Sequence, residues 1–176
     1  GLFNKNTAYA IGDLNVTWET DPLFNETNIA QGFTLTKSVN VDNAAPSPRS
    51  VGVRGILNSD SASMSAVMNI VIKEGATTLY SNTLATFFAE SAGPNGIPLS
   101  TLPVGADTDY DFTVTFDSSA GNDFQNKTIV FDLQIGISID LPAACDSINL
   151  SPNPIIGTSR AETIMGTQGN DLIMGL

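Results

Sequence analysis

Histidine is absent from this 176-residue chain, and cysteine occurs once, as Cys145. Without histidine the chain has no imidazole metal ligand, no Ser-His-Asp or Cys-His pair and no ordinary general base near neutral pH. No serine, cysteine or lysine has a visible activating partner, so we expect no enzymatic activity and no resident cofactor. The lone cysteine cannot form an internal disulfide, and it is either a small buried hydrophobe or a site for an intermolecular bridge.

Positive charge is also scarce, with 7 Lys plus Arg against 18 Asp plus Glu, a net charge of -11 and a pI near 4.1. A nucleic-acid surface needs clustered cations, so we expect no nucleic-acid partner. No apolar run approaches the roughly 20 residues of a membrane helix, so we expect no membrane span. The apolar content of 41% is well above that of a disordered chain and suits one domain with its own core.

Apolar and polar residues alternate with a period of two along most of the chain, which predicts strands with one buried face. The predicted strands are Leu14–Trp18, Phe33–Val41, Ser50–Leu57, Met64–Ile72, Thr77–Ser81, Tyr110–Phe116 and Ile129–Ile139. Only Leu84–Glu90 predicts a helical turn, and the Gly- and Pro-rich stretch Ser91–Pro103 predicts a loop. The pattern indicates an all-β fold of two antiparallel sheets packed face to face.

The first eleven residues form a mixed apolar and polar run that contains Leu2, Phe3, Ala8, Tyr9 and Ile11. We interpret Gly1 as a mature N-terminus left by a processing protease, because the chain starts without Met and without an apolar leader. The run has no close sequence neighbour with which to pair. It can fold back on its own sheet, or it can add a strand to another copy of the protein.

Four Asn-x-Ser/Thr sequons mark potential N-glycosylation sites at Asn15, Asn25, Asn126 and Asn149. We expect all four to be reachable by a glycosylating enzyme, which favours an exported protein. The alternative is that these four asparagines belong to an ordinary polar surface and carry no glycan.

Acidic residues at 107, 109 and 111 superficially resemble the start of an EF-hand loop, but Phe112 occupies the position that needs glycine. We therefore expect these carboxylates on the solvent face of a strand, with surface cation binding as the alternative.

The C-terminal stretch contains two units of nine residues, Gly157–Met165 and Gly166–Met174. The second resembles the RTX nonapeptide, whose turns bind calcium in a parallel β-roll, whereas the first has Arg160 in place of a glycine. Two units, one of them degenerate, supply too few oxygens for a complete site. We expect a vestigial or packing tail, and the candidate calcium ligands are Asp171 and Asn170.

Several short motifs resemble the TasA/camelysin group, which includes biofilm matrix fibres and archaeal bundling pili. They are Leu2–Asn4, Ala10–Val16, Leu35–Asn43 and the late strand Thr128–Ser138. The resemblance spans residues 1–140 and implies a secreted, jelly-roll-like sandwich that polymerises by donor-strand complementation. It implies that Leu2, Phe3, Ala8, Tyr9 and Ile11 are the inserted contacts. Camelysin has been regarded as a metalloprotease, and that property is not carried over to a chain without histidine.

The domain boundaries expected from these features are a donor strand at 1–12, a sandwich at 13–148 and an RTX-like tail at 149–176. The alternating stripe of the last long strand is a candidate acceptor groove, and its residues are Ile129, Phe131, Leu133, Ile135 and Ile137. The first hypothesis is a homopolymeric extracellular filament subunit that serves cell–cell adhesion or a biofilm matrix and contacts neighbouring filaments. The alternative is a monomeric calcium- or glycan-binding module at the cell surface.

Overall fold

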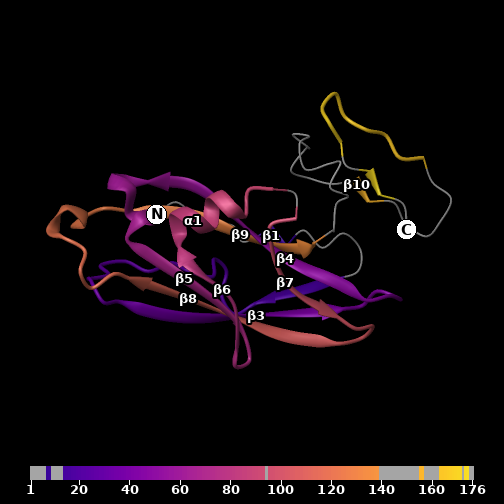
Figure 1. Cartoon of the computed structure of the whole chain (residues 1–176), viewed down its shortest axis with the longest axis horizontal. Helices are drawn as coiled ribbons and strands as arrows, with labels where there is room; N and C mark the ends of the chain where they lie inside the picture. The colour runs from indigo at the N-terminus through magenta and orange to yellow at the C-terminus, as the bar shows by residue number, and fades with distance from the viewer. Residues whose placement is uncertain are drawn as a thin grey trace.

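A computed structural model describes residues 7–8, 14–93, 95–138, 155–156, 163–171 and 173–174 of the chain. The described part forms two main sheets that lie one over the other (Figure 1). In spatial order, the five-stranded sheet consists of β2 (Leu14–Trp18), β3 (Thr34–Asn43), β8 (Asp107–Phe116), β5 (Met68–Glu74) and β6 (Thr77–Thr83). The four-stranded sheet consists of β1 (Thr7–Ala8), β9 (Ile129–Ile137), β4 (Arg49–Asp60) and β7 (Ile97–Leu102).

Every neighbouring pair in these two sheets is antiparallel except β1 and β9, which run parallel. The prediction of an all-β, antiparallel sandwich is therefore confirmed. Among the described residues no helix is long and apolar enough to cross a membrane.

The alternating stripes meet between the two sheets and form one core. Six strands, β2, β3, β4, β5, β8 and β9, contribute inward residues that are 0–1% exposed: Leu14, Val39, Val41, Val51, Val53, Ile70, Ile72, Tyr110, Phe112, Leu133 and Ile135. The intervening residues of β3 and β8 face outward and join across the sheet, as in the hydroxyl pairs Thr34–Thr115 and Thr36–Thr113. Because adjacent side chains of a strand point to opposite faces, period two in the sequence becomes core and surface in the fold.

The predicted helical turn is confirmed as α1 (Leu84–Glu90), which begins where the Thr83 hydroxyl accepts a hydrogen bond from the Thr86 N–H. A threonine N-cap satisfies one of the donors that a helix start leaves unpaired. Leu84 and Phe87 are 0% exposed on the helix face that packs against β4 and β5. The helix approaches β4 closely at Gly55, where a Cβ atom would lie 2.4 Å from the Phe87 ring.

Two predicted boundaries are wrong. The strand expected from Met64 begins only at Met68, and Ser61–Ala66 forms a 3-10 segment in which Ala62 and Ser63 have positive φ. Here the chain crosses from β4 in one sheet to β5 in the other, and the Asp60 carboxylate accepts hydrogen bonds from Ser65. The expected loop Ser91–Pro103 contains β7, an edge strand in which a proline is tolerated.

Asn43, the last residue of the Leu35–Asn43 motif, forms hydrogen bonds with the loop after β3 and with the end of β7. Its side chain is 0% exposed, and its Nδ2 lies 3.0 Å from the carbonyl oxygens of Ser47, Leu102 and Pro103. Its Oδ1 accepts a hydrogen bond from the Ala45 N–H at 3.0 Å. The amide thus satisfies backbone groups on both sides of the chain reversal, which gives this motif residue a structural role.

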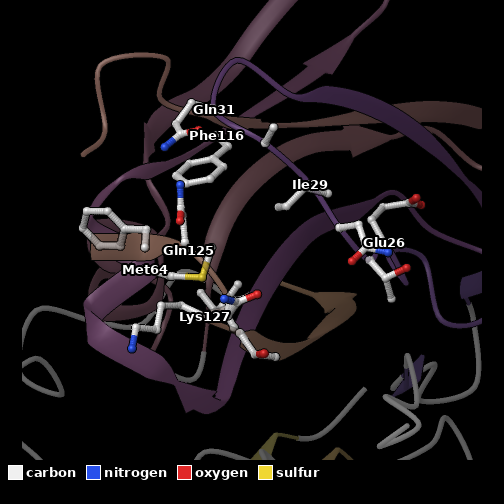
Figure 2. A pocket seen from close by; sticks show the side chains of 14 residues that line it. Glu26, Ile29, Gln31, Met64, Phe116, Gln125 and Lys127 are labelled. Carbon is white, nitrogen blue, oxygen red and sulfur yellow. The ribbon is translucent and has the colours of Figure 1, made fainter. Parts of the chain in front are cut away.

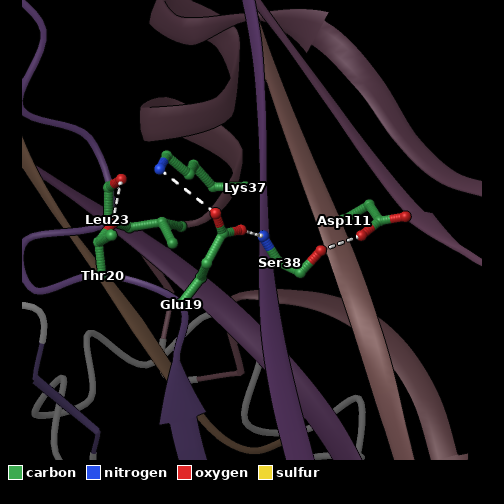
Figure 3. Close-up of polar contacts among 6 residues, drawn as sticks. All are labelled: Glu19, Thr20, Leu23, Lys37, Ser38 and Asp111. Atoms are coloured by element: carbon green, nitrogen blue, oxygen red, sulfur yellow. Dashed lines mark hydrogen bonds and ion pairs between the residues drawn. The ribbon is translucent and has the colours of Figure 1, made fainter.

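The end of β2 is held to β3 by a polar cluster (Figure 3). The Glu19 carboxylate accepts a hydrogen bond from the Ser38 N–H at 2.8 Å and forms an ion pair with Lys37 at 3.3 Å. The hydrogen bond from Ser38 is the main reason that the pKa of Glu19 is lowered, and Lys37 acts in the same direction. On the other side of β3, the Ser38 hydroxyl donates to Asp111 of β8.

Candidate functional site

The edge of β9 is the place where the first described strand, β1, pairs with the last strand of the sandwich. Thr7 pairs with Gln134 and Ala8 with Ile135, so β1 lies parallel to β9 and forms the outermost strand of the four-stranded sheet. Strand β9 has nine residues, and these two are the β9 residues paired with β1 in the described part of the chain. A strand edge with free main-chain groups is a template for a further strand.

The five residues of the candidate acceptor groove have two different environments. Leu133 and Ile135 are 1% and 0% exposed and belong to the common core. Ile129, Phe131 and Ile137 are half-buried and pack against that core. The stripe therefore contributes to the folded core of its own chain, and the main-chain edge of β9 is the part that pairs with β1.

Phe131 lies in a chain of aromatic contacts that fills the space between the sheets near the start of β9. Its ring centroid is 6.4 Å from that of Phe24, in the loop after β2, and 5.5 Å from that of Phe88 in α1. Phe88 in turn contacts Phe87, which contacts Tyr80 of β6. These contacts join Phe131 of β9 to the loop after β2 and to α1, so they add aromatic packing at the start of β9.

Asp132 is the charged residue in the middle of β9, on the face opposite the core stripe. Its Oδ2 accepts a hydrogen bond from Asn58 of β4 at 2.9 Å. Its Oδ1 is buried and has no hydrogen-bond partner among the described residues. A buried carboxylate oxygen without a partner carries a desolvation cost that a donor from a binding partner would remove.

A pocket of about 620 Å³ opens beside the first residue of β9 (Figure 2). Its walls come from the loop 26–31, the segment 124–129, Met64 and Phe116. Glu26 and Lys127 bring opposite charges to the lining, and several amide side chains add donors and acceptors. The arrangement suits a polar, uncharged group such as a sugar or an exposed peptide segment.

Three of the four sequon asparagines lie in the described part, and all three are exposed: Asn15, Asn25 and Asn126. Asn15 donates a hydrogen bond to Asp42 at 2.9 Å. Asn126 has a positive φ of 58° in the turn before β9 and lines the pocket. Asn149 lies outside the described residues. Glycosylation of these positions stays a prediction.

Part of the expected RTX-like tail is described. β10 (Ile155–Ile156) pairs in parallel with β11 (Ile173–Met174), and partners are 18 residues apart, since 173 − 155 = 18, which is twice the nine-residue unit. Asp171 accepts hydrogen bonds from the Thr167 N–H and hydroxyl, while Asn170 is exposed. No group of three or more His, Cys, Asp or Glu among the described residues is placed to hold a metal ion. Calcium binding at Asp171 and Asn170 stays a prediction.

The acidic residues of β8 lie on the outer face, as expected. Asp109 is exposed, and Asp107 and Asp109 both accept hydrogen bonds from Asn40 of β3.

Trp18 is half-buried and packs against the core. Of the proposed inserted contacts, Ala8 belongs to β1, whereas Leu2, Phe3, Tyr9 and Ile11 lie outside the described residues.

Comparisons with known proteins add little to this geometry. Neither a scan against protein-family models nor a search of curated proteins finds a match. Among solved structures, the N-terminal domain of PorA is similar over 77% of this chain and 88% of that chain, at 10% sequence identity and a TM-score of 0.24. A likeness at that level supports no argument about fold or function.

Proposed function

We propose that this protein is the structural subunit of an extracellular homopolymeric filament, and that the N-terminal segment of each subunit pairs with β9 of the next. The pairing of β1 with β9 is the observation that carries the proposal. In the single chain, the described part of the segment takes the first of the two alternatives and lies on its own sheet. A copy of the same segment from a neighbour fits the same edge, which is the logic of domain swapping.

The connection that precedes β2 favours such an exchange. Five residues, 9–13, separate Ala8 in one sheet from Leu14 in the other. A connection of few residues between two strands is the kind of link at which strand exchange occurs between copies of a protein. The resulting junction joins the N-terminal segment of one copy to the β9 edge of another, so it is head-to-tail and propagates as a fibre unless the rotation closes a ring.

The extracellular location rests on independent features of the chain. The described sequons at Asn15, Asn25 and Asn126 are all exposed, and the net charge of -11 gives the subunit a strongly acidic surface. Such a surface disfavours random lateral contact between copies and leaves strand exchange as a specific route to assembly. Adhesion between cells or support of a biofilm matrix is the role that we propose for the filament.

Deletion of residues 1–11 tests the proposal. The full chain should form filaments under electron microscopy in a concentration-dependent manner, whereas the deletion variant should stay monomeric at every concentration. A synthetic peptide of residues 1–13 should bind the deletion variant and raise its Tm, and a scrambled peptide of the same composition is the control. Filaments of normal length from the deletion variant, or no assembly of the full chain, would contradict the proposal.

The pocket beside β9 motivates the second candidate, a monomeric glycan-binding module. Its amide-rich lining and its volume of about 620 Å³ suit a saccharide unit. Size-exclusion chromatography separates the two candidates, because the module predicts a single monomer peak at all concentrations. A calcium-dependent rise in Tm would add support to the calcium-binding form of this alternative.

A further inference from the structure

Residues with a left-handed backbone gather around the pocket beside β9. The described residues other than glycine that have a positive φ are Asn28, Ala62, Ser63 and Asn126. Asn28 and Asn126 line the pocket. Ala62 and Ser63 directly precede Met64, which lines it as well. Such a backbone is costly for a residue with a Cβ atom, and costly conformations cluster where proteins bind ligands. Their convergence on one cavity therefore points to a binding site.

The walls of the pocket are held by hydrogen bonds within the chain. Gln31, at the end of the loop that forms one wall, donates from Nε2 to the carbonyl oxygen of Ala120 at 3.3 Å. Ser61 donates its N–H to the carbonyl oxygen of Thr128 at 2.9 Å, which joins the 3-10 segment to the other wall. A cavity formed in this way spares a ligand much of the cost of ordering loops.

The lining combines apolar surface with primary amides (Figure 2). Half-buried apolar side chains come from Ile29, Phe124 and Ile129. Asn28 and Gln125 are exposed and bring one amide to each wall. Each amide offers N–H donors and a carbonyl acceptor. A fitting ligand therefore carries an apolar group beside a donor and an acceptor.

Resting on the second candidate above, we propose that this pocket binds an N-acetylated hexosamine. The acetamido group of such a sugar has a methyl group, an N–H donor and a carbonyl acceptor on adjacent atoms. The methyl group packs on the apolar lining, and the N–H and carbonyl groups pair with the amides of Asn28 and Gln125.

The charges of the lining favour a neutral ligand. Among the described lining residues the charged ones are Glu26 and Lys127, one of each sign, although the chain as a whole has a net charge of -11. An uncharged sugar enters such a pocket without the desolvation cost of an ion. Binding does not depend on polymerisation, so it applies to a monomer and to a filament subunit alike. In a filament the pocket repeats at every subunit, and multivalent binding strengthens adhesion to a glycan-bearing surface.

Saturation-transfer NMR with the full chain, made in a host that does not glycosylate it, tests the proposal. The probes are N-acetylglucosamine and N-acetylgalactosamine. Glucose and galactose are the matched controls, because they carry a hydroxyl in place of the acetamido group. Transfer should be strongest at the acetamido methyl protons, and the Kd of the controls should be at least about tenfold higher.

Two variants locate the site. Asn28→Gly removes one amide and keeps the backbone, because glycine adopts a positive φ without strain. Gln125→Ala removes the other amide, and each variant should raise the Kd of N-acetylglucosamine at least about tenfold. Asn58→Ala is the control, since it removes an exposed amide on β4 that does not line the pocket, and it should bind like wild type. Thermal unfolding shows that each variant is folded.

The sugar has two sources, because Asn126 on the pocket wall belongs to a sequon. Protein from a glycosylating host distinguishes them. If the glycosylated chain no longer binds the free probe, the pocket holds the chain's own glycan; if it still binds, the ligand belongs to another molecule, and both results support an acetamido site.

Unchanged affinity in both pocket variants would overturn the proposal. Equal binding of glucose and N-acetylglucosamine would overturn the acetamido assignment and leave a glycan-binding module standing. Absence of binding by all four sugars would overturn both. Electron microscopy of the same samples reports separately on the filament.

Discussion

Replacement of Asn43 by alanine should destabilise the sandwich more than any other exchange of a single asparagine described above. The side chain is 0% exposed and uses both N–H groups and its carbonyl oxygen. Alanine would remove four hydrogen-bond contacts. Because two N–H groups serve three carbonyl oxygens, these contacts amount to about three full hydrogen bonds, each with a net contribution of about 1 kcal/mol. The expected loss in the free energy of unfolding is about 3 kcal/mol, which lowers the Tm by about 6–12 °C in a domain of this size.

Chemical denaturation followed by circular dichroism measures this loss. The matched control is Asn40→Ala on the same strand, because Nδ2 of Asn40 donates to the exposed carboxylates of Asp107 and Asp109. That variant should lose less than about 1 kcal/mol. Equal losses in the two variants would refute the reasoning that burial of the Asn43 amide, rather than the presence of a hydrogen bond, determines its contribution.

Three further predictions concern the core. Gly55→Ala should cost about 1–3 kcal/mol, because the new methyl group would meet the rings that α1 places there, whereas Gly121→Ala, with open space around it, should be near neutral in the same denaturation assay. Thr83→Ala should cost about 1 kcal/mol through loss of the N-cap of α1, and Thr83→Ser should restore most of it. Burial raises the pKa of Tyr110 from 10.0 to about 12, so its contribution to stability is intact below pH 10 and is lost as the pH rises towards 12; Tyr110→Phe should show a flatter decline of Tm over that range.

The sheets were largely predictable from the sequence because their pattern is local. In β3, β5 and β8 each inward residue is separated from the next by one outward residue, which is polar throughout β3 and β8, and the buried stripes of Val39, Ile70 and Phe112 follow that period directly. The boundary at Met68 was missed because Met64 and Ala66 continue the alternation of β5 into the crossover, and Met64 is buried there within a 3-10 segment. Strand β7 was missed because its proline and flanking glycines resemble a loop.

The candidate assembly site was much less accessible to sequence reasoning. Alternation alone predicts that β9 is a strand, but not that its partner is a segment 127 residues away in the sequence. The same holds for Asp132, which occupies an ordinary polar position in an alternating pattern. Its significance depends on which oxygen Asn58 leaves free, and that is a property of the folded sheet.

The central claim is that β9 of one subunit binds the N-terminal strand of another, and disulfide trapping tests it most directly. Thr7→Cys and Gln134→Cys, combined in one chain with Cys145→Ser, place two thiols at positions that pair directly between β1 and β9. Neighbouring strands are about 4.8 Å apart, which is within the range of Cα separations that a disulfide spans.

The protein should be oxidised under assembly conditions and separated on a denaturing, non-reducing gel. The account predicts a ladder of covalent multimers that collapses to monomer on reduction, with each single-cysteine variant giving at most a dimer. A sample that contains filaments but runs entirely as an internally cross-linked monomer would contradict it.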